Sequence, residues 1–507
     1  MKCRYKITAS IIIAALLGMG VSCTKDFEKI NTNPTLLTKD IVQVNGFLTR
    51  TQKLSVFDTH FRINQFTGAY NAPDNGFPLQ LYEYGPYFNG FYNPYLISIN
   101  ELIRLTKEDP NLSNKNAIAK ITRAWLMQKL TDAFGDVPFS EAAGPAENII
   151  LQPSYDTQES IYRQLFEDVK EATAQLSNSP DQISYGAADL FFGGDVDLWT
   201  RFANSLRLRM AMRVRYIDPG LAKTNIDEVI NQPLIETNNQ NAKLLSEPSN
   251  SGNSANYSPI INELNGVNKY GLIAGFPYVE LLKTKTDPRL SIYFKPSNAG
   301  GFWRGRPVNL GSAQLARYDG AFEDSSSSIG DYFRSSQFTF NILTAAEVSF
   351  LRAEAALFGI TAENAQTLFT DGISKAMEMV TVAPNDITSF LSTGEATLTG
   401  IEEDKLKQII EQKFISLWYQ SDEAWAEYRR TGYPLIWIGS GSSATNGAIP
   451  RRLTYAGDEY LKNETKVTEA AGRLTGGDKL TSRVWWDVKP GLPYSHPRQG
   501  LFPPETW

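Results

Sequence analysis

The sequence predicts a mainly α-helical protein in which helices pack as pairs, with long irregular segments between some of the pairs. Apolar side chains recur at helical spacing over residues 117–134 and 195–216. Two further helical stretches, residues 345–358 and 362–380, are joined by a turn at Gly359 and together span roughly 34 residues, the length of a tetratricopeptide unit. Because no strict sequence repeat is present, the prediction of a repeat rests on helix pairing.

The first 22 residues have the pattern of a secretory signal peptide. Three basic residues precede an apolar run over residues 11–17, and small residues then lead to Cys23. The run is too short for a membrane-spanning helix, which needs about 20 residues. A cysteine directly after the cleavage zone indicates a lipoprotein signal, in which Cys23 takes a diacylglycerol and is the lipid attachment site. The alternative is an ordinary secreted protein with a stray cysteine.

The small numbers of cysteines and histidines limit the chemistry of the chain. There are two cysteines, and Cys3 lies in the signal peptide, so acylation of Cys23 leaves the mature chain without a thiol or a disulfide. The two histidines, His60 and His496, exclude a metal site built on several histidines. They also leave almost nothing for a Ser-His-Asp or Cys-His centre. We therefore expect no metal site, no cofactor and no enzymatic activity.

The charge balance argues against nucleic acid as a partner. The formal net charge is −6, and removal of the signal peptide with its three basic residues makes the mature chain more acidic. Binding to a phosphate backbone needs a basic footprint. Aromatic residues make up 12% of the chain, more than a helical core usually needs. Because Tyr and Trp serve wet binding surfaces as well as cores, this excess is typical of a ligand-binding protein.

The first half of the chain alternates predicted helices with loops. We expect helices over residues 40–57, 95–105, 117–134, 156–176 and 195–216. Glycine, proline and aromatic residues over the range 68–93 predict a loop, and Gly135 is placed to end the third helix. Four arginines are expected to cover the polar face of the fifth helix: Arg207, Arg209, Arg213 and Arg215.

From residue 231 to residue 340 the helical pattern fails. Gly, Asn, Ser and Pro are dense there, with short strand-like pieces such as residues 290–294. A segment this long without periodicity is expected to serve a ligand or a partner. Helical spacing then returns in two pairs, residues 345–358 with 362–380 and residues 403–419 with 422–430. Earlier in the chain, the helix at 117–134 has a partner in the helix at 156–176. The tail from residue 436 is again irregular.

Six stretches resemble motifs of the SusD/RagB family of nutrient-binding outer-membrane lipoproteins, the SusD-like proteins. They are FEKINTNP from Phe27, RAWLMQKLTDAFGDVPFSEA from Arg123, LWTRFANSLRLRMAMRV from Leu198, DPRL from Asp287, EVSFLRAEAALFG from Glu347 and QKFISLWYQSDEAWAEYRRTGYP from Gln412. The six stretches follow the order of the family and extend over residues 27–434, most of the chain.

This resemblance implies a single SusD-like domain over residues 23–507. Four tetratricopeptide-like helix pairs would form its scaffold, and loops would carry the ligand surface, in a region of about residues 231–340. The implied partner is a SusC-like TonB-dependent outer-membrane transporter, which the lipoprotein covers as a lid. The charged tract after Cys23 resembles the surface-export signal of Bacteroidetes lipoproteins. We therefore expect a protein held in the outer membrane by its lipid anchor and facing the cell surface.

Two carboxylates near the end of a predicted helix have both a catalytic and a structural interpretation. Asp132 and Asp136 flank Gly135. Glycoside hydrolysis uses two acids about 5–10 Å apart, so the pair could be catalytic. The alternative, which we favour, is a helix-end turn in which Asp136 accepts hydrogen bonds from backbone N–H groups.

A second polar cluster lies on the last predicted helix. Glu423, Glu427, Arg429 and Arg430 could bind an anion. Glu427 and Arg430 are i, i+3 neighbours, however, and this spacing favours a salt-bridged helix face. Three tryptophans at helical core positions are expected to pack inside the protein: Trp199, Trp418 and Trp425.

Aromatic side chains in the loops are the candidate ligand-binding residues. Trp303 lies between glycines in the range 300–305, beside Phe302, and Arg304 could supply hydrogen bonds next to the ring. Flat aromatic faces suit the C–H faces of sugar rings. The alternative is that these rings hold the loops onto the scaffold. The further candidates are Tyr82, Tyr84, Tyr87, Tyr318 and Tyr332.

Together these features predict a non-catalytic surface lipoprotein that binds a nutrient oligomer, a glycan in the first place, and delivers it to a SusC-like TonB-dependent transporter. One alternative is a peptide-binding lipoprotein of the same architecture. Another is a secreted glycoside hydrolase on a helical scaffold, and a third is a structural tetratricopeptide adaptor.

Overall fold

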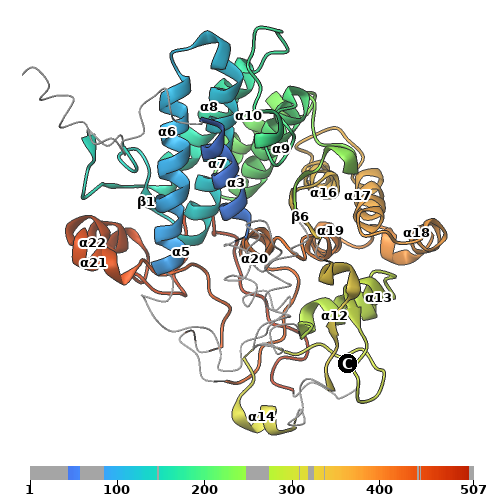
Figure 1. Cartoon of the computed structure of the whole chain (residues 1–507). Coiled ribbons are helices and arrows are strands. Elements are labelled where there is room, and N and C mark those ends of the chain that lie inside the picture. Colours follow the sequence, from blue (N-terminus) through green and yellow to red (C-terminus); the bar gives the residue numbers. More distant parts are fainter. Residues whose placement is uncertain are drawn as a thin grey trace, which may run out of the picture. The chain divides into compact units, whose positions relative to one another are not determined.

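The computed structural model describes residues 44–57, 85–144, 148–246, 273–307, 309–317, 325–335, 337–441, 445 and 447–501 (Figure 1). The chain divides into two compact units, residues 1–44 and 45–507. All described residues except Val44 belong to the second unit. Among them, no helix is both long and apolar enough to cross a membrane.

The scaffold is built from helices that pack in pairs (Figure 1). Neighbours in the chain pack against each other in each pair. The pairs are α7 (Ser113–Phe134) with α8 (Gln158–Gln175), α9 (Val196–Val214) with α10 (Pro219–Val229), α16 (Ala345–Leu357) with α17 (Ala365–Met379), and α19 (Glu402–Ser416) with α20 (Ser421–Thr431). The predicted fold class, a mainly α protein with a helix-pair scaffold, is confirmed.

The helix ends follow local sequence signals. Asp195 precedes α9, and its side chain accepts a hydrogen bond from the Leu198 N–H at 3.0 Å. Such a cap satisfies one of the donors that the first turn of a helix leaves free. At its other end, α7 stops at Gly135, which has φ 85°, a conformation that favours glycine. Gly432 ends α20 in the same way.

Contacts between the pairs join one pair to the next. Helix α8 packs on α9, α9 on α16, and α16 on α19, while α20 returns to α7. Earlier helices cover this scaffold: α6 (Ile97–Thr106) packs on α7. In α3 (Val44–Phe57), the Gln52 amide donates to Asp189 at 2.7 Å. Each helix pair therefore contacts the next pair in the chain, and the last pair contacts the first.

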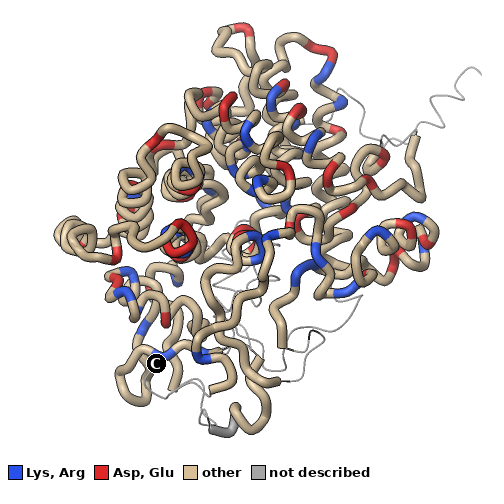
Figure 2. Tube along the Cα trace, turned by 180° about the vertical axis from the view of Figure 1, so that it is seen from behind, with Lys and Arg blue, Asp and Glu red and all other residues tan. Residues whose placement is uncertain are grey.

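The sequence predicted that the arginines at the end of α9 cover its polar face. This prediction is wrong for three of them, which are buried. Arg207, Arg209 and Arg213 are 5%, 4% and 1% exposed. Figure 2 marks charged residues of both signs on the helices of the scaffold. Helix α9 is enclosed because it packs against α8, α10 and α16, so its cations are inside the protein and pair with acids of other helices.

Short pairs of antiparallel strands occur within and at the ends of the irregular segments. β1 (Val137–Pro138) pairs with β2 (Tyr155–Asp156), and β4 (Phe294–Lys295) pairs with β5 (Ser328–Ile329). β3 (Ala242–Leu245) pairs with β6 (Thr339–Leu343), and Ser246 N–H bonds the Phe338 carbonyl at 2.9 Å. The two ends of the long irregular segment thus meet at one place on the scaffold.

Between β3 and β6 the described chain forms a small lobe with helices of its own. These are α12 (Phe276–Thr284), α13 (Leu290–Tyr293) and α14 (Ser312–Arg317) (Figure 1). The strand-like piece expected at residues 290–294 is therefore wrong for most of its length. Asp287 and Arg289 form a buried ion pair at 2.5 Å, and Tyr293 N–H bonds the Arg289 carbonyl, so the turn continues as one helical turn.

Other differences from the predicted elements have clear local causes. Part of the loop predicted over residues 68–93 is α5 (Gly85–Gly90), followed by the wide helical turn η2 (Phe91–Leu96). Burial of Phe88 and Phe91 against the scaffold outweighs the glycine and proline content. Helices also occur where none was predicted: α10, α18 (Pro384–Leu391), α21 (Gly457–Lys462) and α22 (Glu464–Arg473).

Candidate functional site

The two carboxylates that could have formed a catalytic pair both form hydrogen bonds or ion pairs with other residues of the protein. The Asp132 side chain accepts hydrogen bonds from the Tyr162 hydroxyl at 2.6 Å and the Trp486 indole at 2.7 Å. Asp136 accepts a hydrogen bond from the Gln158 backbone N–H at 2.8 Å and pairs with Arg473 at 2.5 Å. The structural interpretation, in which Asp136 holds a helix-end turn, is confirmed by these contacts.

Helices of all four pairs meet in a buried network of ion pairs. Arg213 lies within 2.6 Å of both Glu423 and Glu427. Arg430 pairs with Glu427 at 2.6 Å and Glu354 at 2.7 Å. The network also includes the pairs Arg209–Glu347 and Arg215–Glu354, both at 2.7 Å, and Lys413–Glu427 at 3.2 Å. The Glu427–Arg430 pair confirms the expected salt bridge, so these groups stabilise the scaffold and do not form an open anion site.

Burial and neighbouring charges move the pKa values of this network in opposite directions. Burial alone raises the pKa of the Glu427 carboxyl, but the charges of Arg430 and Lys413 lower it well below its ordinary value. Burial raises the pKa of Asp132, although Arg213 opposes the change. Burial lowers the pKa of the Arg429 guanidinium to about 9. Arg429 therefore remains a cation at neutral pH, held by the Asp132 carbonyl at 2.6 Å and stacked on Trp425.

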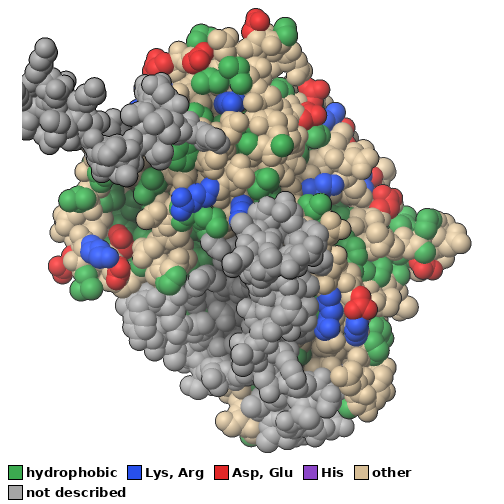
Figure 3. Space-filling model, in the orientation of Figure 1, with side chains coloured by type: hydrophobic (Ala, Val, Ile, Leu, Met, Phe, Trp, Pro, Cys, Tyr) green, Lys and Arg blue, Asp and Glu red, His purple; other side chains and the backbone are tan. Residues whose placement is uncertain are grey.

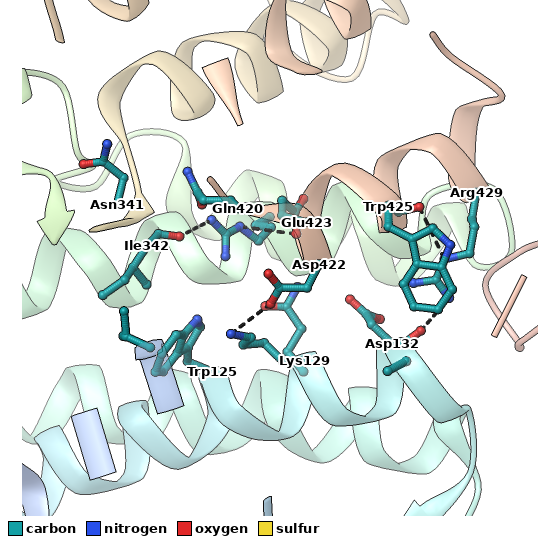
Figure 4. Close-up of a pocket in the computed structure, with 14 residues that line it drawn as sticks. Trp125, Lys129, Asp132, Asn341, Ile342, Gln420, Asp422, Glu423, Trp425 and Arg429 are labelled. Carbon is teal, nitrogen blue, oxygen red and sulfur yellow. Dashed lines mark hydrogen bonds and ion pairs between the residues drawn. The ribbon is translucent and has the colours of Figure 1, made fainter. Parts of the chain in front are cut away.

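A small hollow beside the network is too tight for a sugar. It encloses about 30 Å³ between α7 and α20, and Lys129 reaches Asp422 across it at 2.9 Å (Figure 4). A buried water needs roughly 10–15 Å³ on this measure, so there is space for water but not for a pyranose ring. Trp199, Trp418 and Trp425 are at most 2% exposed, which confirms that they pack in the core.

The segment that carries Trp303 is a loop outside this scaffold, and backbone hydrogen bonds hold it in place. The Arg306 N–H bonds the Ala274 carbonyl at 2.8 Å, and the Ser327 N–H bonds the Arg304 carbonyl at 2.8 Å. Gly305 passes so close to α12 that an added Cβ would lie 2.5 Å from the Phe276 Cα. Only glycine fits such an approach without a shift of the backbone. Two neighbouring segments therefore fix the backbone on both sides of Trp303.

The three central candidates lie next to one another with decreasing exposure. The Phe302 side chain is 40% exposed, Trp303 is half-buried, and Arg304 is 5% exposed. Lys283 of α12 donates to the Trp303 carbonyl at 3.1 Å. Phe302 and Trp303 are thus available at the surface of a fixed loop, while Arg304 belongs to its support.

The other candidates do not join this group. Tyr87 is 3% exposed and packs on Phe91 and Phe134 with ring centroids 5.1 and 6.0 Å away. The Tyr332 hydroxyl donates to the Met379 carbonyl at 3.0 Å, on the side of α17. Three further candidate tyrosines and the cysteine predicted to be the lipid attachment site lie outside the described residues: Tyr82, Tyr84, Tyr318 and Cys23.

A second hollow lies where the sequence had predicted only an irregular tail. It has a volume of about 360 Å³ and lies between the described residues of the ranges 436–440, 447–449 and 493–499, with Tyr428 of α20 in its wall. Ligand pockets typically measure about 300–1,000 Å³. The available sequence signal was the aromatic and proline content after residue 490, which is too general to indicate a pocket.

Metal-ligating groups do not cluster in the described part of the chain. No three or more His, Cys, Asp or Glu side chains there are arranged to hold a metal ion. On the face shown in Figure 3, described acidic and basic side chains are interspersed among polar and apolar ones.

Comparison with known proteins identifies the family. Residues 26–456 match the model of a SusD-like family described as "Starch-binding associating with outer membrane". Since the match covers most of the chain, the protein belongs to this family of SusD-like proteins. A search of curated proteins found no match.

Solved structures support the same fold. A structure named "chitin-binding protein" is 26% identical, with a TM-score of 0.76, and the match covers 88% of this chain and 100% of that one. A SusD homolog from Bacteroides uniformis is 24% identical, with a TM-score of 0.74 and the same coverage. A chitin-binding SusD homolog from Flavobacterium johnsoniae is also 24% identical, with a TM-score of 0.74 over 88% of this chain and 99% of that one.

Family membership confirms several predictions at the level of the class. SusD-like proteins bind glycans without a catalytic step, so the prediction that the chain is not an enzyme is confirmed. The family is one that associates with the outer membrane, as expected.

Proposed function

We propose that this protein is a surface lipoprotein, anchored through Cys23, that binds a neutral glycan oligomer and delivers it to a SusC-like TonB-dependent transporter. The ligand surface in this proposal is the glycine-flanked loop that presents Phe302 and Trp303. Binding and release of the unchanged oligomer are the whole of its chemistry.

The observation that carries the proposal is the support given to Trp303. Its backbone is pinned to α12 by Lys283 and to the β5 segment through Ser327, while the neighbouring Phe302 ring is 40% exposed. An aromatic surface held in place loses little conformational entropy when a ligand packs on it. Such a surface fits the apolar C–H face of a sugar ring, and hydroxyl groups at the rim of the ring can reach polar neighbours.

Two other observations favour a glycan over a peptide. Two of the similar structures are named as chitin-binding, one of them 26% identical to this chain. The loop also presents two aromatic side chains, the exposed Phe302 and the half-buried Trp303, which suit the C–H faces of sugar rings. The alternative is peptide binding, and the following experiment distinguishes it from glycan binding.

The test uses the mature protein on arrays of neutral oligosaccharides and of peptides, followed by a search for new reducing ends in the bound sugars. We expect binding to at least one oligosaccharide series and no new reducing ends. Binding to peptides alone would replace the proposed ligand class. Hydrolysis that is lost in Asp132→Asn would reverse the assignment to a binding protein.

Localisation and partner have a separate test. Protease added to intact cells is expected to digest the protein if it faces outward, and affinity purification in mild detergent is expected to recover a TonB-dependent transporter with it. A protein that is protected in intact cells, or that is recovered without a transporter, contradicts this part of the proposal.

A further inference from the structure

The hollow between residues 436–440, 447–449 and 493–499 has walls that hydrogen bonds hold together. The Trp437 indole donates to the carbonyls of Arg498 and Leu501, both at 3.0 Å. The Gln499 side-chain amide forms two hydrogen bonds with the backbone of Ile438. It donates to the Ile438 carbonyl at 2.7 Å and accepts from the Ile438 N–H at 3.2 Å. These contacts lock the two chain segments together, so the volume of about 360 Å³ lies between fixed walls.

The wall of this pocket is chemically neutral. No Asp, Glu, Lys or Arg is among the described residues that line it. The Nδ1 of His496, a described lining residue, accepts the Arg498 N–H at 3.2 Å, and its Nε2 lies 3.3 Å from Glu280. Among the described lining residues, a charged ligand group would find no Asp, Glu, Lys or Arg as a counter-charge, whereas a neutral one avoids that cost.

Tyr428 supplies a hydroxyl group to the wall of the pocket. The residue is 3% exposed and is among the described residues that line the pocket. Burial raises the pKa of Tyr428 to about 12, so the hydroxyl stays protonated and can both donate and accept a hydrogen bond. A polar ligand atom in the pocket could therefore bond to this hydroxyl.

Aliphatic and aromatic groups supply the rest of the surface. Ile436 and Ile449 are buried in the wall, and the half-buried Tyr494 also lines it, with its ring packed on Tyr433 at 5.5 Å between centroids. Apolar faces next to a few fixed polar groups match a pyranose ring, which has apolar C–H faces and a rim of hydroxyl groups.

The pocket is connected to the Trp303 loop through one helix. On α12, Glu280 holds His496 of the pocket wall, and Lys283 holds the Trp303 carbonyl. Residues three positions apart lie on the same face of a helix, about 4.5 Å apart along its axis. The supports of the two surfaces are therefore neighbours on α12.

We infer that this pocket is a second sugar subsite, which takes one neutral pyranose unit and uses the Tyr428 hydroxyl to bind it. The inference rests on the proposed glycan-binding function and assigns a further site to it. Trp303 supplies an open stacking surface, and the pocket encloses a single unit of the ligand.

The test compares Ser495→Trp with Thr481→Trp. Ser495 is exposed at the pocket, so an indole there fills the hollow without disturbing the core, while Thr481 is equally exposed but does not line it. Binding of neutral monosaccharides (glucose, galactose, mannose, xylose and N-acetylglucosamine) is measured by saturation-transfer NMR, and that of their oligomers by calorimetry. We expect Ser495→Trp to abolish monosaccharide binding and Thr481→Trp to leave it within twofold.

Two further variants separate this inference from the proposed function. Tyr428→Phe removes the hydroxyl alone, and the loss of one neutral hydrogen bond should weaken monosaccharide binding about two- to tenfold. Trp303→Ala should weaken the binding of oligosaccharides, because the proposed function places its ring in the ligand surface. If oligosaccharides bind and weaken with Trp303→Ala but are unaffected by Ser495→Trp and Tyr428→Phe, the subsite is wrong and the proposed function stands. If no sugar binds the wild-type protein, both are wrong.

Discussion

Replacement of Arg213 by Met is the sharpest test of the buried network. The guanidinium is fully buried and lies 2.6 Å from Glu423, 2.6 Å from Glu427 and 3.3 Å from Asp132. Methionine fills similar space but leaves these carboxylates without their shared cation. Loss of one partner from a buried ion pair costs about 3–5 kcal/mol, because the remaining charge is uncompensated.

This cost converts into a measurable change of the melting temperature. Unfolding entropy is about 2.1 cal/mol/K per residue, so a unit the size of residues 45–507 has roughly 1 kcal/mol/K. We therefore expect Arg213→Met to melt about 3–5 °C below the wild type in scanning calorimetry. The variant should also recover part of this loss between pH 7 and pH 5. Its unpaired carboxyls would have raised pKa values, so they contribute stability at low pH that disappears as pH rises.

Arg163→Met is the matched control. Arg163 also contacts two acids, Glu159 at 2.9 Å and Asp218 at 2.7 Å, but its side chain is 48% exposed. Exposed ion pairs contribute about 0–1 kcal/mol, so the melting temperature should fall by at most about 1 °C. Equal melting temperatures for the two variants would refute the reasoning that burial increases the contribution of these ion pairs to stability.

Three other predictions follow from the sequence and the structure. Cys23→Ala should move the protein from the membrane fraction to the soluble fraction; a variant that stays in the membrane would exclude Cys23 as the anchor. Gly305→Ala should destabilise the Trp303 loop by about 1–3 kcal/mol, seen in chemical denaturation, because the new Cβ meets the Phe276 backbone; an unchanged midpoint would show that the loop adapts. Burial alone raises the pKa of Glu427, but nearby cations lower it below the value in the unfolded chain. The Glu427 carboxylate therefore stabilises the fold above the unfolded pKa of about 4.3, and this stability is lost as pH falls through the lower folded pKa. Denaturation at pH 7, 5 and 3 should therefore show the fall between the last two values, and a loss already complete at pH 5 would contradict it.

The helix pairs were predictable because long helices carry strong local signals. Helix α16 begins after Thr344 and ends at Leu357, within one residue of the range expected from apolar spacing. Helix α10 was missed although Asp218 caps it and Pro219 opens it, a start signal that the low periodicity of the segment obscured. The helix at residues 85–90 was missed because glycine and proline content favoured a loop, whereas burial of its aromatic residues decides its structure.

The burial of the α9 arginines has one signal in the sequence. Leu206, Leu208, Met210 and Met212 place apolar side chains on several faces of that helix, which is typical of a helix enclosed on all sides. An enclosed helix forces its cations to find buried acids. Three of the acids that pair with Arg209 and Arg213, Glu347, Glu423 and Glu427 on α16 and α20, lie more than 130 positions away, so spacing along the chain could not pair them.

The Trp303 loop was predicted from its flanking glycines, but its supports could not be. Contacts with Lys283 and Ser327 depend on how the lobe folds back on itself. The C-terminal pocket depends even more on tertiary structure, since its walls come from α20 and two separate tail segments.

Calorimetric titration of Trp303→Ala, with Trp485→Ala as control, tests the central claim most directly. Trp485 is another half-buried tryptophan, and it packs beside Tyr162 of the scaffold, 6.0 Å between ring centroids. With an oligosaccharide identified on the array, we expect Trp303→Ala to lose at least about tenfold in affinity, which is 1.4 kcal/mol, and to keep its melting temperature within about 1 °C. Trp485→Ala should keep its affinity. A fall of about 3–5 °C in the melting temperature of Trp303→Ala with affinity intact, as expected for a core tryptophan that costs about 3–5 kcal/mol, would contradict the assignment of Trp303 to the ligand surface.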